Sequence, residues 1–562
     1  MKILQSSCIT LLSMLCILPM FILSSTDETY EKERSKIINN ENDQRLGSEL
    51  TLNREEKQIS DHLMKLKEQE TGLYMSGVEL NPSSILFTDA KKQIDQSKVF
   101  HFLQKMPKGG VLHVHGTAMT SVDWLVSFVT YMPNCYMCWD RQREIVFKFL
   151  FCPKLPKPTK GKCSSTPYSR VNLEGIVIAG CSWERVCYAR KYYTEGAKAF
   201  DKMLINSIIF NSDKLMSVTS NQTAIWKTFE EYFSLTRNLI RYKPVFSKYI
   251  HHGLTELLKD NIQHVEIRIS LSSTYQLDGN RSSSLTVAEQ LVSAINSFRR
   301  EECSNCTVRI IVTCHRNAPD SVISQRLEDA ISISQKYPKY FAGFDLVGQE
   351  DTGKTLKTLM NILKNKNISF FFHAGETNEQ GSPIDENLVD AILLGTKRIG
   401  HGYALVKHPA LLKLVQKRNL PIEVCPISNQ VLGFVHDLRN HPANYLIANN
   451  YPVVISSDDP AVWQASGLSH DFYLTFMGMV SMKADLRVLK QLAINSIKFS
   501  SLPAAEREIA LEDWKQRWNN FITLAIYYLD ESKRRGPVTE ESFLDHVNQD
   551  TFRSVFRESF NK

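Results

Sequence analysis

Residues 109–115 read GGVLHVH, an apolar run with two histidines near its end. Seven further short apolar runs follow it, separated by longer stretches with helical spacing: HVEIRIS (264–270), VRIIVTCH (308–315), FAGFDLVG (341–348), ISFFFHAG (368–375), RIGHG (398–402), PIEVCP (421–426) and PVVISSDD (452–459). Runs of this kind are typical of strands that are buried on both faces of a sheet. Eight of them alternating with helices predict an α/β fold, a (β/α)8 TIM barrel.

Polar side chains gather at the predicted carboxyl ends of these strands, the face on which such barrels build active sites. His113 and His115 are two positions apart, so both project to one face of their strand. The ends of later strands carry His373, Glu376, His401, Asp458 and Asp459. Three imidazoles and one carboxylate are a ligand set suited to zinc. The remaining residues of the set are then available for proton transfer and substrate contact.

Each of these residues also has an interpretation without a metal. A single histidine in a strand is more often a buried residue whose hydrogen bonds are satisfied. Asp459, which precedes Pro460, fits a helix N-cap with proline at the first helical position. The joint placement of the needed groups at four separate strand ends favours the metal site.

A second arrangement imitates a different zinc site. His264-Val-Glu266 followed by Cys303-Ser-Asn-Cys306 is similar to the H-x-E…P-C-x-x-C signature of cytidine-type deaminases. The proline of that signature is missing, with Glu302 in its place. We expect a small disulfide or separate bridges at these cysteines instead of a metal site.

Composition excludes several classes of protein. Of 562 residues, 43% are hydrophobic and 23% are charged, a globular mixture that excludes a disordered or fibrous chain. The net charge of +7 is a mild bias on so long a chain, and it is weaker evidence for nucleic-acid binding than a clustered basic stripe would be. We therefore expect no nucleic-acid partner.

Residues 1–25 have the pattern of a secretory signal peptide. Lys2 precedes an apolar run over residues 9–23 (ITLLSMLCILPMFIL), and small residues and then a polar stretch follow. The alternative is an uncleaved anchor, although Pro19 interrupts the run, which is shorter than the ~20 residues of a membrane span. Secretion would expose the sequons to glycosylation, with candidate sites at Asn221, Asn280, Asn305 and Asn367.

The chain divides into four predicted parts: a signal peptide (1–25), a helical arm (26–107), the barrel (108–530) with a Cys-rich insertion (about 133–200), and a C-terminal tail (531–562). The arm is thinly apolar and would need a partner surface to be stable. In an oxidising compartment the insertion's cysteines predict at least one disulfide. Its lysine-rich stretch 148–163 (KFLFCPKLPKPTKGKC) is either a solvated loop or a patch for anionic glycans or a cell-surface receptor.

Six motifs in this order resemble the adenosine deaminase family: MPKGGVLHVH, GFDLVG, FFHAGET, RIGHG, EVCPISNQ and ISSDDPA. The signal peptide, the arm and the insertion are similar to its secreted branch, the adenosine deaminase-related growth factors. The resemblance runs from about residue 50 to 530. It implies a barrel of the metal-dependent amidohydrolase type with one zinc per chain, bound by His113, His115, His373 and Asp458, and a homodimer formed through residues 26–107.

The same resemblance implies roles for other residues. Glu376 would be the proton donor, His401 the partner of the attacking water, and Asp459 and Gly348 contacts to the purine. His315 and the stretch WKTFEEYF (226–233) resemble substrate-pocket positions of the secreted branch, with Trp226, Phe229, Glu230 and Phe233 as the candidate contacts. Cys138 and Cys163 match that branch's insertion disulfide.

One position departs from the family pattern. Active relatives usually carry an aspartate that contacts the ribose after the second histidine of the first strand, whereas Gly116 follows His115 here. A lost charge-assisted hydrogen bond costs about 1.5–3 kcal/mol, which is roughly tenfold to a hundredfold in affinity. Weaker adenosine binding is the resulting hypothesis, and aspartate at this position would be expected to lower KM.

The sequence thus predicts a secreted zinc-dependent adenosine deaminase that converts adenosine, and 2'-deoxyadenosine as a further substrate, to inosine and ammonia. Its growth-factor effect would follow from depletion of extracellular adenosine. The alternative is a receptor-binding growth factor on the deaminase scaffold with little turnover. A guanine or deoxynucleoside deaminase with the same metal ligands is a third hypothesis. Glu376 and His401 favour an enzyme, because binding alone needs neither, and Gly116 favours the binding protein.

Overall fold

The computed structural model describes residues 27–140, 146–151, 181–216 and 221–535, and the predicted barrel is confirmed. Its eight strands are β1 (Gly109–His115), β5 (Ile262–Ile269), β6 (Thr307–His315), β7 (Phe341–Val347), β8 (His373–Ala374), β9 (Ile399–His401), β10 (Ile422–Val424) and β11 (Val453–Ile455). Each of the eight predicted apolar runs contains or overlaps one of them.

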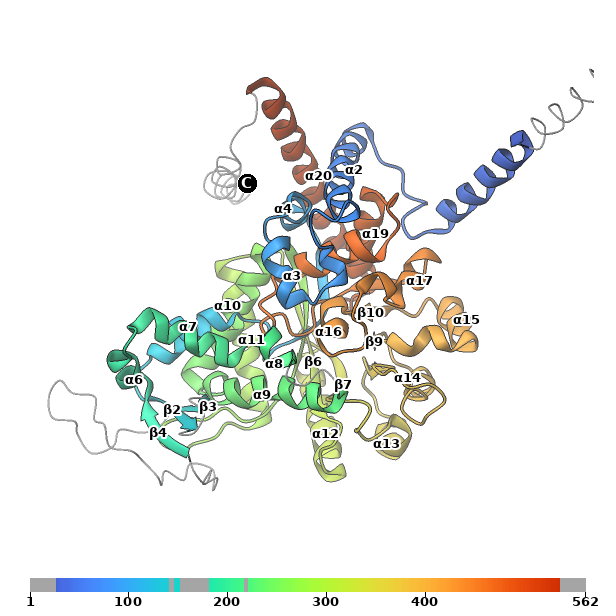
Figure 1. Ribbon diagram of the computed structural model, residues 1–562. Coiled ribbons are helices and arrows are strands. Elements are labelled where there is room, and N and C mark those ends of the chain that lie inside the picture. The colour runs from blue at the N-terminus through green and yellow to red at the C-terminus, as the bar shows by residue number, and fades with distance from the viewer. Residues whose placement is uncertain (1–26, 141–145, 152–180, 217–220, 536–562) are drawn as a thin grey trace, which may run out of the picture.

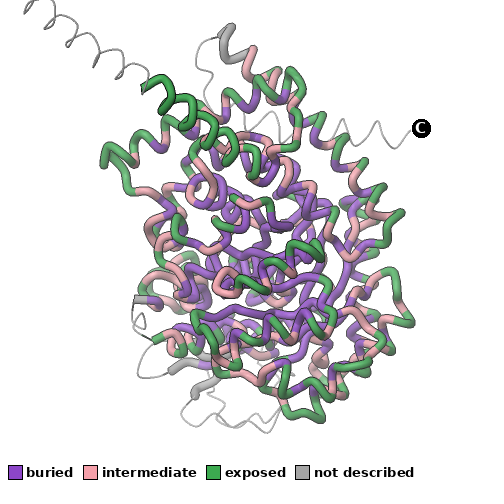
Figure 2. The backbone as a smooth tube through the Cα atoms, turned by 90° about the vertical axis from the view of Figure 1, so that its right-hand side faces the viewer, coloured by how far each residue is buried: buried purple, intermediate pink, exposed green. Residues whose placement is uncertain are grey.

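The strands form a closed ring. They pair in parallel as two four-stranded sheets, in the orders β1-β5-β6-β7 and β11-β10-β9-β8. Single parallel bridges join the sheets at both edges, from Val114 to Asp458 and from Phe344 to Phe370. The strands are buried almost throughout, as their apolar composition requires, and Figure 2 shows this buried core running through the molecule.

Helices surround the ring and connect its strands (Figure 1). Those that follow β5 are α11 (Ser284–Glu301), α12 (Asp320–Lys336), α13 (Leu356–Leu363), α14 (Asn387–Leu393), α15 (Pro409–Arg418), α16 (Pro426–Val431), α17 (Ala443–Ala448), α18 (Ser469–Leu474), α19 (Leu486–Lys498) and α20 (Ala504–Arg535). Helix α20 passes through the predicted boundary at residue 530, so the barrel and the tail are not separated by a break there. No helix among the described residues is both long and apolar enough to cross a membrane.

The segment between β1 and β5 holds a small sheet that the sequence did not predict. β2 (Cys135–Asp140) pairs antiparallel with β3 (Val146–Phe151) and β4 (Cys181–Arg185). One helix, α5 (Val122–Ser127), precedes this sheet in the chain. Five helices follow it: α6 (Val186–Tyr192), α7 (Ala197–Ile208), α8 (Ser212–Met216), α9 (Gln222–Ile240) and α10 (Lys243–Lys259). Cys163 and most of the lysine-rich stretch lie outside the described residues. The pairing of Cys138 with Cys163 therefore stays a prediction.

The N-terminal arm is helical. A helix spans residues 27–44, and α2 (Arg54–Met75), α3 (Phe87–Ile94) and α4 (Lys98–Lys105) follow it. The apolar side chains Ile59 and Leu63 of α2 are buried, and its Glu56 accepts a hydrogen bond of 2.7 Å from the Trp518 indole of α20. The arm's partner surface is thus in part the C-terminal helix of the same chain. The helix 27–44 is mostly exposed and projects from the body of the molecule (Figure 1).

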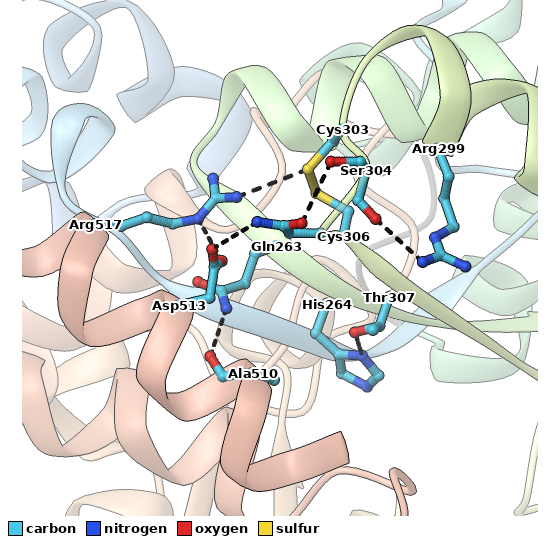
Figure 3. The surroundings of a disulfide bond; sticks show 11 residues. Gln263, His264, Arg299, Cys303, Ser304, Cys306, Thr307, Ala510, Asp513 and Arg517 are labelled. Carbon is cyan, nitrogen blue, oxygen red and sulfur yellow. Dashed lines mark hydrogen bonds and ion pairs between the residues drawn. A yellow bond between two sulfur atoms is a disulfide. The ribbon is translucent and has the colours of Figure 1, made fainter. Parts of the chain in front are cut away.

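The two cysteines of the sequence that is similar to a cytidine-deaminase site form a disulfide, as expected. Cys303 and Cys306 are bonded to each other beside β5 and β6 (Figure 3). His264 is hydrogen-bonded on both ring nitrogens, to the Thr307 hydroxyl at 2.7 Å and to Glu266 at 3.1 Å. The histidine therefore has no nitrogen left to bind a metal.

Candidate active site

A cavity of about 390 Å³ lies at the carboxyl ends of the barrel strands. It is lined by twelve of the residues selected from the sequence: His115, Trp226, Phe229, Glu230, Phe233, His315, Gly348, His373, Glu376, His401, Asp458 and Asp459. His113 is fully buried against them. Strand ends far apart in the chain and one face of α9 thus bring the predicted site residues together.

Four of these residues can hold one metal ion. His113, His115, His373 and Asp458 each offer a ligand atom, and these atoms lie within 4.8 Å of one another. Asp458 Oδ1 is 3.3 Å from His113 Nε2 and 3.1 Å from His115 Nε2. Among the described residues, His113 Nε2 and Asp458 Oδ1 are buried without a satisfying hydrogen bond. Buried polar atoms of this kind normally have partners, so three imidazole nitrogens and one carboxylate oxygen fit zinc.

A second group of potential ligands overlaps the first. It combines His113 and Asp458 with His401 and Cys425. A cysteine binds metal as the thiolate. Burial, together with the negative charge of Asp458, raises the pKa of the Cys425 thiol well above its usual value. The three-histidine set is therefore the better zinc site.

Two buried carboxylates orient the histidines. Glu423 Oε2 lies 2.9 Å from His113 Nδ1, and Asp345 Oδ2 lies 2.7 Å from His373 Nδ1. Such pairs turn the other ring nitrogen toward the metal and make it a stronger ligand. Neither acid was predicted from the sequence, although each stands alone in an otherwise apolar strand, which was a usable signal.

Two arginines neutralise these carboxylates. Arg268 donates to Asp345 at 2.8 Å and to Glu423 at 2.6 Å, and Arg398 donates to Glu423 from the other side. Burial alone would raise the pKa of Glu423, but the two arginines hold it well below its usual value. The acid is therefore ionised, which is the state that orients His113.

The backbone is strained at two site residues. His401 has φ of 60° and Asp458 has φ of 58°, in the left-handed region that residues other than glycine rarely adopt. Strain of this kind persists where the surrounding structure imposes it, and it is concentrated at functional sites. These two turns point the imidazole and the carboxylate into the cavity.

Glu376 and His401 are set in opposite protonation states. Burial, with the charges of Asp458 and Glu350, raises the pKa of Glu376 well above its usual value. Burial also lowers the pKa of His401 well below its usual value, although Asp458 opposes the shift. Glu376 Oε1 lies 3.4 Å from His401 Nδ1 and has no hydrogen-bond partner among the described residues. These directions favour a carboxyl that can give a proton and an imidazole that can take one.

Asp459 lies buried in the cavity beside Asp458. Burial and the charge of neighbouring Asp458 raise the pKa of Asp459 well above its usual value, so it can act as a hydrogen-bond donor. Its Oδ1 is buried and unpartnered in the described structure, as expected of a group that awaits a ligand. Gly348 has φ of 97°, a conformation that glycine adopts at little cost and that lets the backbone approach a ligand closely.

The structure adds residues that sequence analysis did not select. Asn429 Nδ2 lies 3.2 Å from His401 Nδ1, and its Oδ1 lies 3.1 Å from His441 Nε2, so a polar chain holds the imidazole in place. The further residues that line the cavity are Thr117, Ser234, Arg237, Arg268, Ile269, Ser270, Thr313, Val347 and Leu432. Most lie inside strands or helices, where no motif marks them.

Gly116 is closely packed against two side chains of β5. A Cβ atom on Gly116 would lie 2.7 Å from Ile267 Cγ2 and 3.0 Å from Ile269 Cδ1. Any side chain there must displace these two isoleucines. The expectation that aspartate would lower KM is therefore not supported by this backbone.

We expect Gly116→Asp and Gly116→Ala each to destabilise the fold. Overpacking against Ile267 and Ile269 should lower the free energy of unfolding by about 1–3 kcal/mol, measured by chemical denaturation. KM for adenosine should not fall in either variant. A lower KM with undiminished stability in Gly116→Asp alone would show that the aspartate does reach the substrate.

The four sequons have exposed asparagines. Asn221, Asn280, Asn305 and Asn367 all lie at the surface, and Asn221 also caps the first turn of α9. Exposure is what glycosylation requires, and the modification itself remains a prediction.

Comparison with known proteins agrees with this geometry. The family model described as adenosine deaminase matches residues 210–515, and the one described as adenosine/AMP deaminase N-terminal matches residues 11–103. The chain is 40% identical to adenosine deaminase 2-A of Danio rerio over 501 residues, which are 87% of this chain and 93% of that protein. It is also 40% identical to adenosine deaminase 2 of Homo sapiens over 503 residues, 89% of this chain and 93% of that protein. A solved N6-mAMP deaminase from Arabidopsis shares the fold, with a TM-score of 0.51 and 13% identity over 74% of this chain and 99% of that one.

Proposed function

Because the chain belongs to the adenosine deaminase family and is a hydrolytic deaminase, we propose that it converts adenosine to inosine and ammonia, with 2'-deoxyadenosine as a further substrate. The observation that carries this proposal is the joint presence, in one cavity, of the buried carboxyl of Glu376 and the buried imidazole of His401 beside a three-histidine cluster. Burial raises the pKa of Glu376 and lowers that of His401, which are the directions that a proton donor and a proton acceptor need.

Each site residue has a separate role in the proposed reaction. Water adds to the purine carbon that bears the amino group, the adjacent ring nitrogen takes a proton, and ammonia leaves. Glu376 donates its proton to that ring nitrogen, and His401 accepts the proton that the attacking water loses and passes it to the amino group, which leaves as ammonia when the C–N bond breaks. The new hydroxyl group gives its remaining proton back to Glu376 as the carbonyl of inosine forms. Asp459 and the backbone of Gly348 hold the ring in place, while Trp226 of α9 helps to keep bulk water out.

The cofactor of this proposal is one zinc ion. It would be held by His113, His115, His373 and Asp458, where it would make water acidic enough to supply hydroxide at neutral pH. His113 Nε2 and Asp458 Oδ1, which are buried without a hydrogen-bond partner among the described residues, support this assignment.

We expect removal of the metal by a chelator to abolish deamination. Readdition of zinc should restore it, with full activity at one zinc per chain by elemental analysis. Full turnover by protein shown to be free of metal would contradict the assignment.

The direct test of the function is the ultraviolet change that accompanies conversion of adenosine to inosine. Turnover by the zinc-loaded chain would establish the deaminase. No turnover at millimolar adenosine, with zinc bound and the fold intact, would favour the alternative of a receptor-binding growth factor on the deaminase scaffold.

The finer parts of the proposal concern the chain outside the barrel. We propose that residues 1–25 direct secretion, that the protein acts on extracellular adenosine, and that residues 26–107 form a homodimer interface. The exposed helix 27–44, with Ile37 60% exposed, supports the last point. Expression in eukaryotic cells tests these parts. Secretion predicts protein in the medium that begins after residue 25 and carries glycans. Dimerisation predicts a native mass twice that of one chain.

A further inference from the structure

Helix α9 lines the cavity along most of its length. Six of its side chains contribute, at spacings that place them on one face of the helix: Trp226, Phe229, Glu230, Phe233, Ser234 and Arg237. The first part of this face is largely aromatic, and the last member is an arginine. The helix therefore presents a cation to the same cavity that holds the catalytic residues.

The two charged residues of this face lie at different sides of the barrel. Glu230 Oε1 is 3.7 Å from His315 Nε2, at the end of β6. The end of α9 beyond Arg237 contacts the loop that follows β5, where the Tyr275 hydroxyl donates to the Asn238 carbonyl at 2.6 Å. Arg237 follows Glu230 by seven positions of the helix, a rise of about 10 Å. Arg237 thus lies toward the β5 side, away from the acid.

The charge of Arg237 is not neutralised within the described part of the chain, where it has no acidic partner. The other arginine of the cavity, Arg268, is paired with Asp345 and Glu423. The lining residues from the ends of β1 and β5 carry no acid and include the hydroxyls of Thr117 and Ser270. Arg237 is an exposed residue that lines the same cavity as these hydroxyls. A guanidinium in such a place can bind a phosphate with two parallel hydrogen bonds.

The proposed orientation of the substrate brings its sugar toward this arginine. Gly348, Glu376 and Asp459 hold the purine at the ends of β7, β8 and β11. In the proposed orientation the sugar lies on the β5 side of the cavity, which Arg268, Ile269 and Ser270 line. We propose that the enzyme also deaminates adenosine monophosphates, with Arg237 of α9 binding the phosphate on the sugar. This inference rests on the proposed function and extends it from nucleosides to nucleotides.

The experiment compares adenosine, 5'-AMP and 3'-AMP as substrates, by ammonia release, for the intact chain and two variants. Arg237→Gln removes the charge that faces the cavity. Lys227→Gln removes the same charge from an exposed position of α9 that does not line the cavity, and so controls for the net charge of the helix.

We expect the intact chain to convert at least one monophosphate, and the two isomers show which sugar position reaches Arg237. Arg237→Gln should lower kcat/KM for that monophosphate relative to adenosine by tenfold or more, chiefly through KM, since a charge-assisted hydrogen bond contributes about tenfold to a hundredfold in affinity. Lys227→Gln should leave the ratio unchanged. The inference would be overturned if the intact chain converts adenosine but neither monophosphate. It would also be overturned if Arg237→Gln leaves the ratio of kcat/KM for the monophosphate to that for adenosine unchanged. Both outcomes leave the proposed function intact. Failure to convert any of the three substrates would overturn both.

Discussion

Replacement of Glu376 by glutamine is expected to lower kcat for adenosine by about 10²- to 10⁴-fold, the usual contribution of a general acid. Glutamine has the shape of the protonated carboxyl but cannot give up a proton to the purine ring. The side chain is buried and its Oε1 makes no hydrogen bond to the described residues, so the change should cost little stability. Single-turnover kinetics on zinc-loaded protein measure the effect.

The matched control is Glu379→Gln, the same chemical change at an exposed residue of the same loop. It should leave kcat within about twofold. The pH dependence gives an independent check, because activity is present below the raised pKa of Glu376 and is lost as the pH rises through it. A Glu376→Gln variant that keeps its turnover would assign the proton donor to another group.

The substitution Glu423→Gln is expected to lower the free energy of unfolding by about 3–5 kcal/mol, because it leaves buried Arg268 and Arg398 without their shared charge partner. It also removes the carboxylate that orients His113, which should weaken zinc binding by about 10- to 100-fold. Chemical denaturation measures the first effect, and competition with a chromophoric chelator measures the second.

Glu289→Gln provides the comparison for this variant. Glu289 pairs with Lys336 at 3.3 Å, and about half of each side chain is exposed, so its loss should cost at most about 1 kcal/mol and leave zinc affinity unchanged. Equal stability of the two variants would mean that the charge of Glu423 does not stabilise the two buried arginines. Unchanged zinc affinity in Glu423→Gln would mean that His113 is oriented without it.

The strands and the site residues at their ends were predictable because both follow local rules. A strand buried on both faces must be apolar at nearly every position, so each of the eight strands can be recognised in the sequence as a short apolar run. In a parallel barrel the strands all end at the same face, so His115, His373, His401 and Asp458 had to meet there.

The partners of these residues were not predictable in the same way. His113 and Glu423 are 310 positions apart, and only closure of the ring makes them neighbours. The antiparallel sheet of the Cys-rich insertion was missed because its short strands are separated by stretches without a clear period. The tight packing of position 116 was not predictable either, because Ile267 and Ile269 lie on another strand, about 150 residues further along the chain.

The sequence by itself determined the barrel, the family and the set of imidazoles and carboxylates at the strand ends, since strand periodicity and short motifs are local properties of the chain. Only the tertiary structure decided which carboxylate orients which histidine, that the pKa of Glu376 is raised while that of His401 is lowered, and that Arg237 lines the cavity. The physical reason is that burial, charge pairing and the placing of α9 over the strand ends arise between segments far apart in sequence, and exist only when the ring has closed.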